Sequence, residues 1–221
     1  MLGLEFPLLF TRLIALIMSL TVHEFAHAWS AFKFGDDTAQ RAGRLSFNPL
    51  HHLDPVGSLM MLLVGFGWAK PVPINPYTLQ RSSPGAVMWV SLAGPFSNFL
   101  LAILSAIPFR MGWVDLSQAW NVQSGALPTL PYFLLNFMVI NLSLMLFNLL
   151  PIAPLDGEKM ALYLLPTSWA RGLASVSHYG PFILLGFILL GNYAGIDILG
   201  AIMGPALINL LQLLLGIGGL Q

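Results

Sequence analysis

Five long apolar segments take up most of this chain, at about residues 7–34, 84–109, 128–150, 169–191 and 196–218. A helix of ~20 apolar residues is long enough to cross the hydrocarbon core of a bilayer. Of the 221 residues, 57% are hydrophobic and 8% are charged, whereas a soluble domain carries about 25% charged residues. The sequence therefore predicts an all-α polytopic membrane protein with about five to six transmembrane or re-entrant helices.

A small membrane-associated β region is expected between the first and second full spans. There, residues 41–47 have the pattern of a short strand, and prolines confine any strand at residues 70–76 to the edge of a sheet. Residues 56–68 form an apolar run of about a dozen, which is too short to cross a core of ~30 Å. We expect this run to be re-entrant or interfacial.

Composition excludes several other classes of protein. The chain has no cysteine, which excludes disulfides, CxxC redox chemistry and cysteine zinc sites. Its formal net charge is zero and it has no run of Lys or Arg, so nothing indicates nucleic-acid binding. The N-terminus lacks the basic region and the cleavage site of a signal peptide, so the first apolar segment is expected to remain as a helix.

An HExxH motif, His23 to His27, lies within the first apolar segment. Two histidines four residues apart on a helix project from the same face, so both imidazoles can reach one metal ion, and zinc suits such ligands. Glu24 lies beside that face, where its carboxylate can accept a proton from metal-bound water. The motif predicts a site for one Zn²⁺ per chain. The alternative is a helix with two satisfied polar histidines, but ionisable groups in apolar surroundings are costly and by default functional.

A third metal ligand is needed, because catalytic zinc usually has three protein ligands and one open position. Asp156 is the favoured candidate, since it lies in an apolar, proline-broken segment, and such a segment is tolerated at membrane depth only when buried in protein or lining a cavity. Asp54 is the next candidate, and Glu158 is expected to pair with Lys159. The other candidates are Asp36, Asp37, His51, His52 and His178.

The distribution of basic residues predicts an orientation. Five of the nine Lys and Arg residues lie between the first and second full spans, namely Lys33, Arg41, Arg44, Lys70 and Arg81. The positive-inside rule therefore places residues 35–83 in the cytosol. The HExxH motif and Asp156 then each lie about nine residues, or ~13 Å, from the cytosolic end of their own helix. This common depth favours one shared site towards the cytosolic side.

Three strings together resemble the site-2 protease family of intramembrane zinc metalloproteases, peptidase family M50. They are HExxH in a membrane helix, Gly94-Pro95 with Asn98 in a later span, and the stretch NLLPIAPLDG from Asn148 to Gly157. The resemblance covers residues 20–160. The strings at 48–55 and 67–73 are similar to those of the compact prokaryotic branch, which has no PDZ or CBS domain.

The resemblance implies roles for particular residues. It implies His23, His27 and Asp156 as zinc ligands, Glu24 as the general base, and Asn148 as a group that holds the substrate carbonyl or its oxyanion. The activity implied is hydrolysis of peptide bonds within or near the transmembrane segments of membrane-protein substrates.

The same resemblance implies a domain organisation and a location. Residues 1–221 are expected to form one integral-membrane metalloprotease domain, with a core at 7–165 and variable C-terminal helices at 169–218. The expected location is the prokaryotic cell membrane, where the partners would be the lipid bilayer and membrane-embedded substrates, without nucleic acid.

Some residues outside the implied zinc site have two interpretations. The expected strands at 41–47 and 70–76 would hold an unwound substrate by β-augmentation, or they are ordinary loop. His52 would contact substrate, or it serves a turn or a cap. Asn98 would contact substrate, or it packs helices together. His178 is expected to be structural.

Three other functions are alternatives to proteolysis. An inactive protease-like scaffold would be indicated by the loss of Glu24 or of a metal ligand, and all of these are present. A small membrane transporter would be indicated by inverted repeats and polar positions along a path, and the sequence shows neither. A zinc hydrolase that acts on lipid is the third alternative.

The orientation can be checked by labelling a single introduced cysteine, because the chain has none of its own. In cells that express Gly43→Cys, an impermeant thiol reagent is expected to react only after the membrane is opened. Labelling of intact cells at this position would reverse the orientation.

Overall fold

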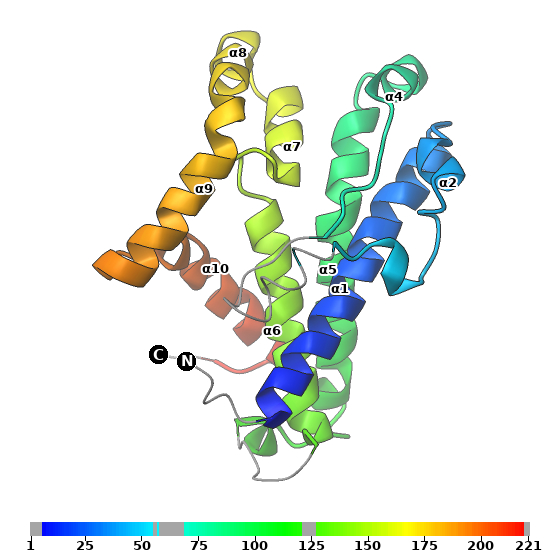
Figure 1. Cartoon of the computed structure of the whole chain (residues 1–221). Coiled ribbons are helices and arrows are strands. Elements are labelled where there is room, and N and C mark those ends of the chain that lie inside the picture. The colour runs from blue at the N-terminus through cyan, green and yellow to red at the C-terminus, as the bar shows by residue number, and fades with distance from the viewer. Residues whose placement is uncertain (1–5, 55–56, 58–68, 121–126, 219–221) are drawn as a thin grey trace. The chain divides into compact units, whose positions relative to one another are not determined.

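The computed structural model describes residues 6–54, 57, 69–120 and 127–218 and is helical throughout its regular elements (Figure 1). The elements in chain order are α1 Phe6–Lys33, α2 Thr38–Arg41, η1 Pro49–His51, α4 Pro76–Ser82, α5 Ala86–Arg110, η2 Leu116–Trp120, α6 Leu130–Asn148, α7 Asp156–Leu164, α8 Thr167–Val176, η3 Ser177–Tyr179, α9 Gly180–Leu189, η4 Leu190–Ala194 and α10 Ile198–Leu215.

Within the part of the chain that the structure describes, five stretches of helix are long and apolar enough to cross a bilayer, judged by length and composition. They are Leu8–Lys33, Ala86–Arg110, Leu130–Asn148, Thr167–Leu189 and Ile198–Leu215. Each corresponds to one of the apolar segments in the sequence, so the prediction of a helical, multi-pass membrane protein is confirmed.

The end of α1 follows from its sequence. Gly35 has a φ of 84°, a left-handed conformation that glycine adopts without a steric penalty. The N–H of Asp36 then donates to the carbonyl of Ala31 at 3.0 Å, which satisfies one of the last carbonyls of the helix. This cap ends α1 at Lys33, between one and two turns after the HExxH motif.

The predicted β region is wrong for the residues that the structure describes. Residues 41–47 contain the end of α2 and turns, and residues 70–75 are irregular. The β pairing in the described part of the chain is one isolated antiparallel bridge between Leu53 and Ala69. The predicted re-entrant run at 56–68 lies outside the described residues, apart from Gly57.

The physical reason for this error is that local acceptors take the backbone donors a strand would use. The N–H groups of residues 41–44 donate to main-chain carbonyls of residues 37–40, and the N–H of Asn75 donates to Oδ2 of Asp36 at 2.6 Å. Pro71 and Pro73 have no N–H to give to a neighbouring strand. Neither segment therefore has a row of free donors with which to build a ladder.

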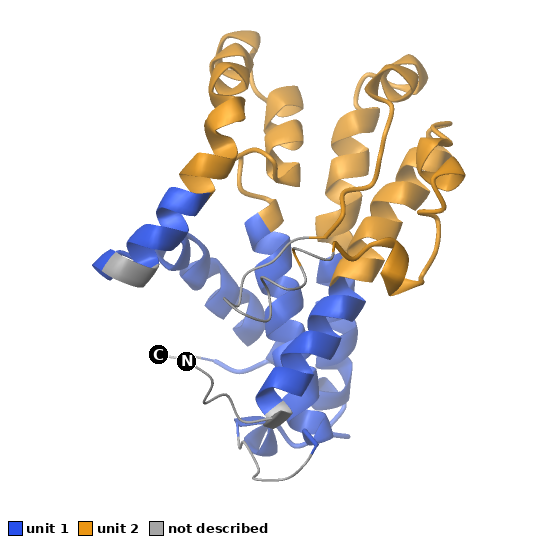
Figure 2. Cartoon of the chain, viewed as in Figure 1, with its two compact units in different colours: residues 1–19, 98–147, 185–221 blue, residues 20–97, 148–184 orange. Residues whose placement is uncertain are grey.

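The chain divides into two compact units (Figure 2). One contains residues 1–19, 98–147 and 185–221, and the other contains residues 20–97 and 148–184. The long helices α1 and α5 contribute to both. Organisation as a single metalloprotease domain stays a prediction.

In the first unit, a buried amide pair links two of the spanning helices. Asn98 of α5 donates from Nδ2 to Oδ1 of Asn141 on α6 at 2.9 Å and to the carbonyl of Ser19 on α1 at 3.4 Å. Both asparagines are fully buried. These hydrogen bonds provide partners for polar amide groups that are buried among apolar helices.

In the second unit, α1, α4 and α5 share a small apolar core. Ala31, Leu79, Ala86 and Val90 are buried together there. The same unit contains a close approach of main chains where α6 ends and α7 begins. A Cβ on Gly157 would lie 2.3 Å from the carbonyl oxygen of Leu149, so only glycine fits directly after Asp156.

Candidate metal centre

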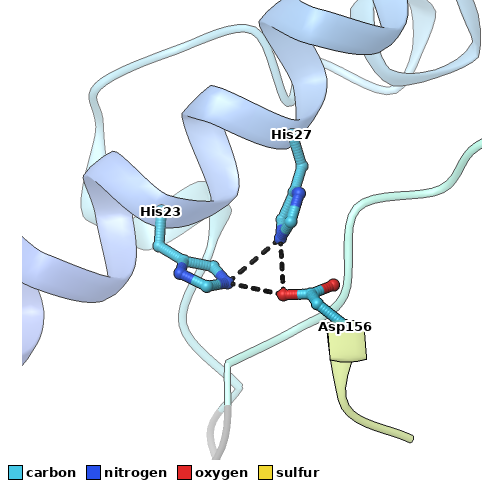
Figure 3. Close-up of side chains that lie close together, drawn as sticks. All are labelled: His23, His27 and Asp156. Atoms are coloured by element: carbon cyan, nitrogen blue, oxygen red, sulfur yellow. Dashed lines mark hydrogen bonds and ion pairs between the residues drawn. The ribbon is translucent and has the colours of Figure 1, made fainter. Parts of the chain in front are cut away.

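Two helices of the second unit bring three side chains together (Figure 3). His23 and His27 project from the same face of α1, and Asp156 is the first residue of α7. Oδ2 of Asp156 lies 3.2 Å from Nε2 of His23 and 3.1 Å from Nε2 of His27, and the two Nε2 atoms are 3.0 Å apart. The three residues therefore form one cluster, although Asp156 lies 129 residues after His27 in the sequence.

The cluster has the geometry of a zinc site. All three residues are buried, and each offers one ligand atom to a common point. Ligand atoms about 2.0–2.1 Å from a tetrahedral zinc ion are separated from each other by ~3.3 Å. The three edges of 3.0 to 3.2 Å are close to this separation, so the residues fit the ion without rearrangement of either helix.

The tautomer of His27 also suits a metal ligand. Its Nδ1 donates a hydrogen bond to the carbonyl oxygen of Val90 on α5 at 2.7 Å. In the neutral imidazole the proton then lies on Nδ1, so Nε2 carries the lone pair that a metal requires. Metal-bound histidines usually make such a bond to a carbonyl or carboxylate, which fixes the orientation of the ring.

Gly94 on α5 is the residue that makes room for the two imidazoles. A Cβ at this position would lie 2.4 Å from Nε2 of His27 and 2.5 Å from Nε2 of His23. Any larger side chain would occupy the place where the ligand atoms converge. The structure shows that the Gly-Pro step of this span lies against the histidine pair.

Glu24 lies on the same turn of α1 but is not part of the cluster. Its Oε2 accepts a hydrogen bond from the main-chain N–H of Val72 at 3.2 Å, and the residue is buried, with 9% of its surface exposed. A carboxylate beside a metal site and outside the ligand set has the arrangement of a general base rather than of a ligand.

The second oxygen of Asp156 faces a cation. Nζ of Lys159, one turn further along α7, lies 3.9 Å from Oδ1. Among the described residues, Lys159 therefore forms its ion pair with Asp156. The predicted pairing of Lys159 with Glu158 is wrong. The reason is helical spacing, because residues three apart share a face and adjacent residues do not.

The other candidates for the third ligand have local contacts of their own. Asp36 holds two main-chain N–H groups, and Asp37 pairs with Arg41. Asp54 accepts from the N–H of Gly57. The rings of His51, His52 and His178 contact the Gly43 carbonyl, the Ser46 carbonyl and the Tyr179 ring, respectively. Among the described residues, Asp156 alone completes a three-ligand group with the two motif histidines.

The remaining predicted site residues lie outside this group. Asn148 is the last residue of α6 and is partly buried. His52 is fully buried, and its Nε2 donates to the carbonyl of Ser46 at 2.7 Å, which fits a structural role in the loop. Asn98 makes the interhelical contact described above. Substrate contacts by these three residues stay predictions.

Two parts of the site have no signal in the sequence. The carbonyl of Val90 and the N–H of Val72 are main-chain groups, and every residue other than proline carries them. Their involvement depends on which segments pack against α1. The prolines on both sides of Val72 were the available sign that this stretch is unusual.

Comparison with known proteins gives a consistent result. The chain is 41% identical over 184 residues to YwhC of Bacillus subtilis, named as a candidate zinc metalloprotease, and the match covers 81% of each chain. It is 32% identical over 177 residues to Rip2 of Mycolicibacterium smegmatis and 29% identical over 173 residues to Rip2 of Mycobacterium tuberculosis, which carry the same kind of name. Those two matches cover 76% of this chain and 62% of each Rip2. No family model and no solved structure matches the chain.

Removal of the third ligand is expected to abolish metal binding. Asp156→Ala leaves two imidazoles, which are too few for a stable zinc site. Purified protein should then lose most of its zinc by elemental analysis, and Asp54→Ala should retain about one zinc per chain. Loss of zinc from Asp54→Ala alone would transfer the assignment to Asp54.

A single methyl group at position 94 is also expected to disrupt the site. Gly94→Ala places a Cβ against both Nε2 atoms, and α5 would have to shift to relieve the overlap. Zinc content should fall, whereas Gly204→Ala, whose Cβ would meet nothing within 4 Å, should leave it unchanged. Full zinc occupancy in Gly94→Ala would contradict the described packing of α5 against the histidines.

Proposed function

We propose, from the premise that this chain belongs to the site-2 protease family of zinc metalloproteases, that it hydrolyses peptide bonds within or near the transmembrane segments of membrane-protein substrates. The observation that carries the proposal is the buried cluster of His23, His27 and Asp156 beside the carboxylate of Glu24. Two of these ligands and the carboxylate lie on α1, which is long and apolar enough to span a bilayer. A hydrolytic site on such a helix suits a substrate that is itself in the membrane.

The chain's residues divide the work between binding and proton transfer. His23, His27 and Asp156 would hold one zinc ion through Nε2, Nε2 and Oδ2. When bound there, zinc would polarise the scissile carbonyl and lower the pKa of a water ligand towards ~7. Val90 keeps the proton of His27 on Nδ1 and so keeps Nε2 available.

Glu24 has the role of general base in this proposal. Its carboxylate would take a proton from the attacking water and later deliver it to the leaving amine. Asn148 would donate its side-chain N–H to the developing oxyanion, as the family resemblance implies. A helical substrate must unwind first, because its peptide bonds are hydrogen-bonded and shielded within the helix.

The proposed location is the cell membrane of a prokaryote, with the site towards the cytosol. The support is the concentration of Lys and Arg between the first two full spans. The structure also improves the labelling test of this orientation. Gly43 has a φ of 69°, which favours glycine, and Gln40 is exposed on α2, so Gln40→Cys is the less disruptive position.

The decisive experiment separates metal binding from catalysis. Glu24→Gln keeps the size of the side chain and removes its basicity, so the proton-transfer step, typically worth ~10²- to 10⁴-fold, should be lost. The purified variant is expected to retain about one zinc per chain and to be nearly inactive on a single-span membrane substrate. Cleavage by the wild-type protein should stop with a chelator and return when zinc is added.

Glu158→Gln is the matched control, because it makes the same chemical change on α7, two residues from Asp156. It should retain both zinc and activity. Loss of zinc from Glu24→Gln would make Glu24 a ligand. Full activity of Glu24→Gln would contradict the role of Glu24 as general base. Absence of chelator-sensitive cleavage by the wild-type protein would contradict the protease assignment and leave the scaffold, transporter and lipid-hydrolase alternatives.

A further inference from the structure

The irregular segment at residues 70–75 passes directly beside the proposed general base. Its sequence, KPVPIN, has a proline on each side of Val72. Proline has a fixed φ, lacks an N–H, and restricts the residue before it to extended conformations. Val72 therefore carries the one main-chain donor between Lys70 and Ile74, on a stretch of backbone that has little conformational freedom.

That single N–H donates a hydrogen bond to Glu24. The N–H of Val72 lies 3.2 Å from Oε2 of Glu24. Among the described residues, Val72 is the hydrogen-bond donor to the Glu24 side chain, and its N–H engages one of the two carboxylate oxygens. In the proposed function, the other oxygen, Oε1, would carry out the proton transfer.

Both ends of the segment are tied to buried groups. At the first end, the N–H of Lys70 donates to the carbonyl of His52 at 2.8 Å, and Arg44 donates from Nη1 to the carbonyl of Lys70 at 3.3 Å. At the second end, the N–H of Asn75 donates to Oδ2 of Asp36 at 2.6 Å. Arg44, His52 and Asp36 are all buried, so the segment is held in place independently of Glu24.

We propose that the main-chain N–H of Val72, held between Pro71 and Pro73, is a positioning group that fixes the Glu24 carboxylate for its role as general base. The inference rests on the proposed function. A glutamate side chain on a helix has several rotamers, and proton transfer needs one of them within hydrogen-bond reach of the water. A donor on a tethered, proline-stiffened segment selects that rotamer at little cost in entropy, because the segment is already ordered.

The contact itself can be measured without proteolysis. Since prolines contribute no N–H, hydrogen exchange of residues 70–75 reports on four amides, those of Lys70, Val72, Ile74 and Asn75. In zinc-loaded protein, Glu24→Ala should speed the exchange of the Val72 amide by roughly 10- to 100-fold, the range for losing a hydrogen bond to a charged group. Glu24→Gln keeps a carbonyl acceptor and should keep the protection. As a matched control, Asp36→Ala should release the Asn75 amide instead.

The functional effect is tested by removing the donor. Val72→Pro lacks the N–H, and Val72→Ala retains it. With zinc content unchanged, Val72→Pro is expected to lower kcat by about 10- to 100-fold with little change in KM, since a misplaced catalytic group costs rate of this order. Val72→Ala should be close to wild type.

Three results would overturn the inference: unchanged exchange of the Val72 amide in Glu24→Ala, a wild-type kcat in Val72→Pro, or a raised KM with unchanged kcat. The last would make the segment a substrate-binding element. If Val72→Pro does not fold, the exchange experiment still decides, because it uses changes at Glu24 alone. A wild-type protein that cleaves no membrane peptide would count against the proposed function, whereas the exchange result would stand by itself.

Discussion

Burial of a carboxylate between two imidazoles is the interaction on which the second unit depends. His23, His27 and Asp156 are each less than 10% exposed, and a buried polar group costs free energy unless it finds a partner. The three facing atoms lie 3.0 to 3.2 Å apart, and with the proton of His27 on Nδ1 its Nε2 can only accept. Acceptor atoms this close together need a shared cation, a proton or a metal ion. The start of α7 and the middle of α1 therefore meet at a set of atoms that a cation would hold together.

Small residues are the second requirement of this arrangement. Gly94 lets α5 approach the two imidazoles, and Gly157 lets the first turn of α7 approach the main chain of Leu149. In apolar helices that gain little from hydrophobic burial, such close approaches supply van der Waals contact and bring main-chain acceptors within reach. The bond from His27 to the carbonyl of Val90, one turn from Gly94, is an example.

The loops next to the site are organised by buried polar side chains rather than by strands. Asp36 accepts two main-chain N–H groups from different segments, and Arg44 reaches the carbonyls of His51 and Lys70. Strand propensity and proline placement predicted a β region, because such patterns assume that the main chain of one strand pairs with the main chain of another. Here carboxylates and a guanidinium satisfy the main chain, and a sequence pattern does not show which side chains will do so.

The sequence by itself determined the membrane spans, the HExxH pair and the chemical class of the site, because these depend on local periodicity and on the number of apolar residues needed to cross a bilayer. It favoured Asp156 but left Asp54 and other acids open, since nothing local brings residue 156 to residue 27. Only the tertiary structure decided that Asp156 completes the cluster, that Gly94 faces the histidines, and that Val72 holds Glu24. Those outcomes depend on contacts between segments that are distant in the sequence. The contacts of Gly94 and Val72 use main-chain atoms, so the residue types along the chain do not specify which segments will meet.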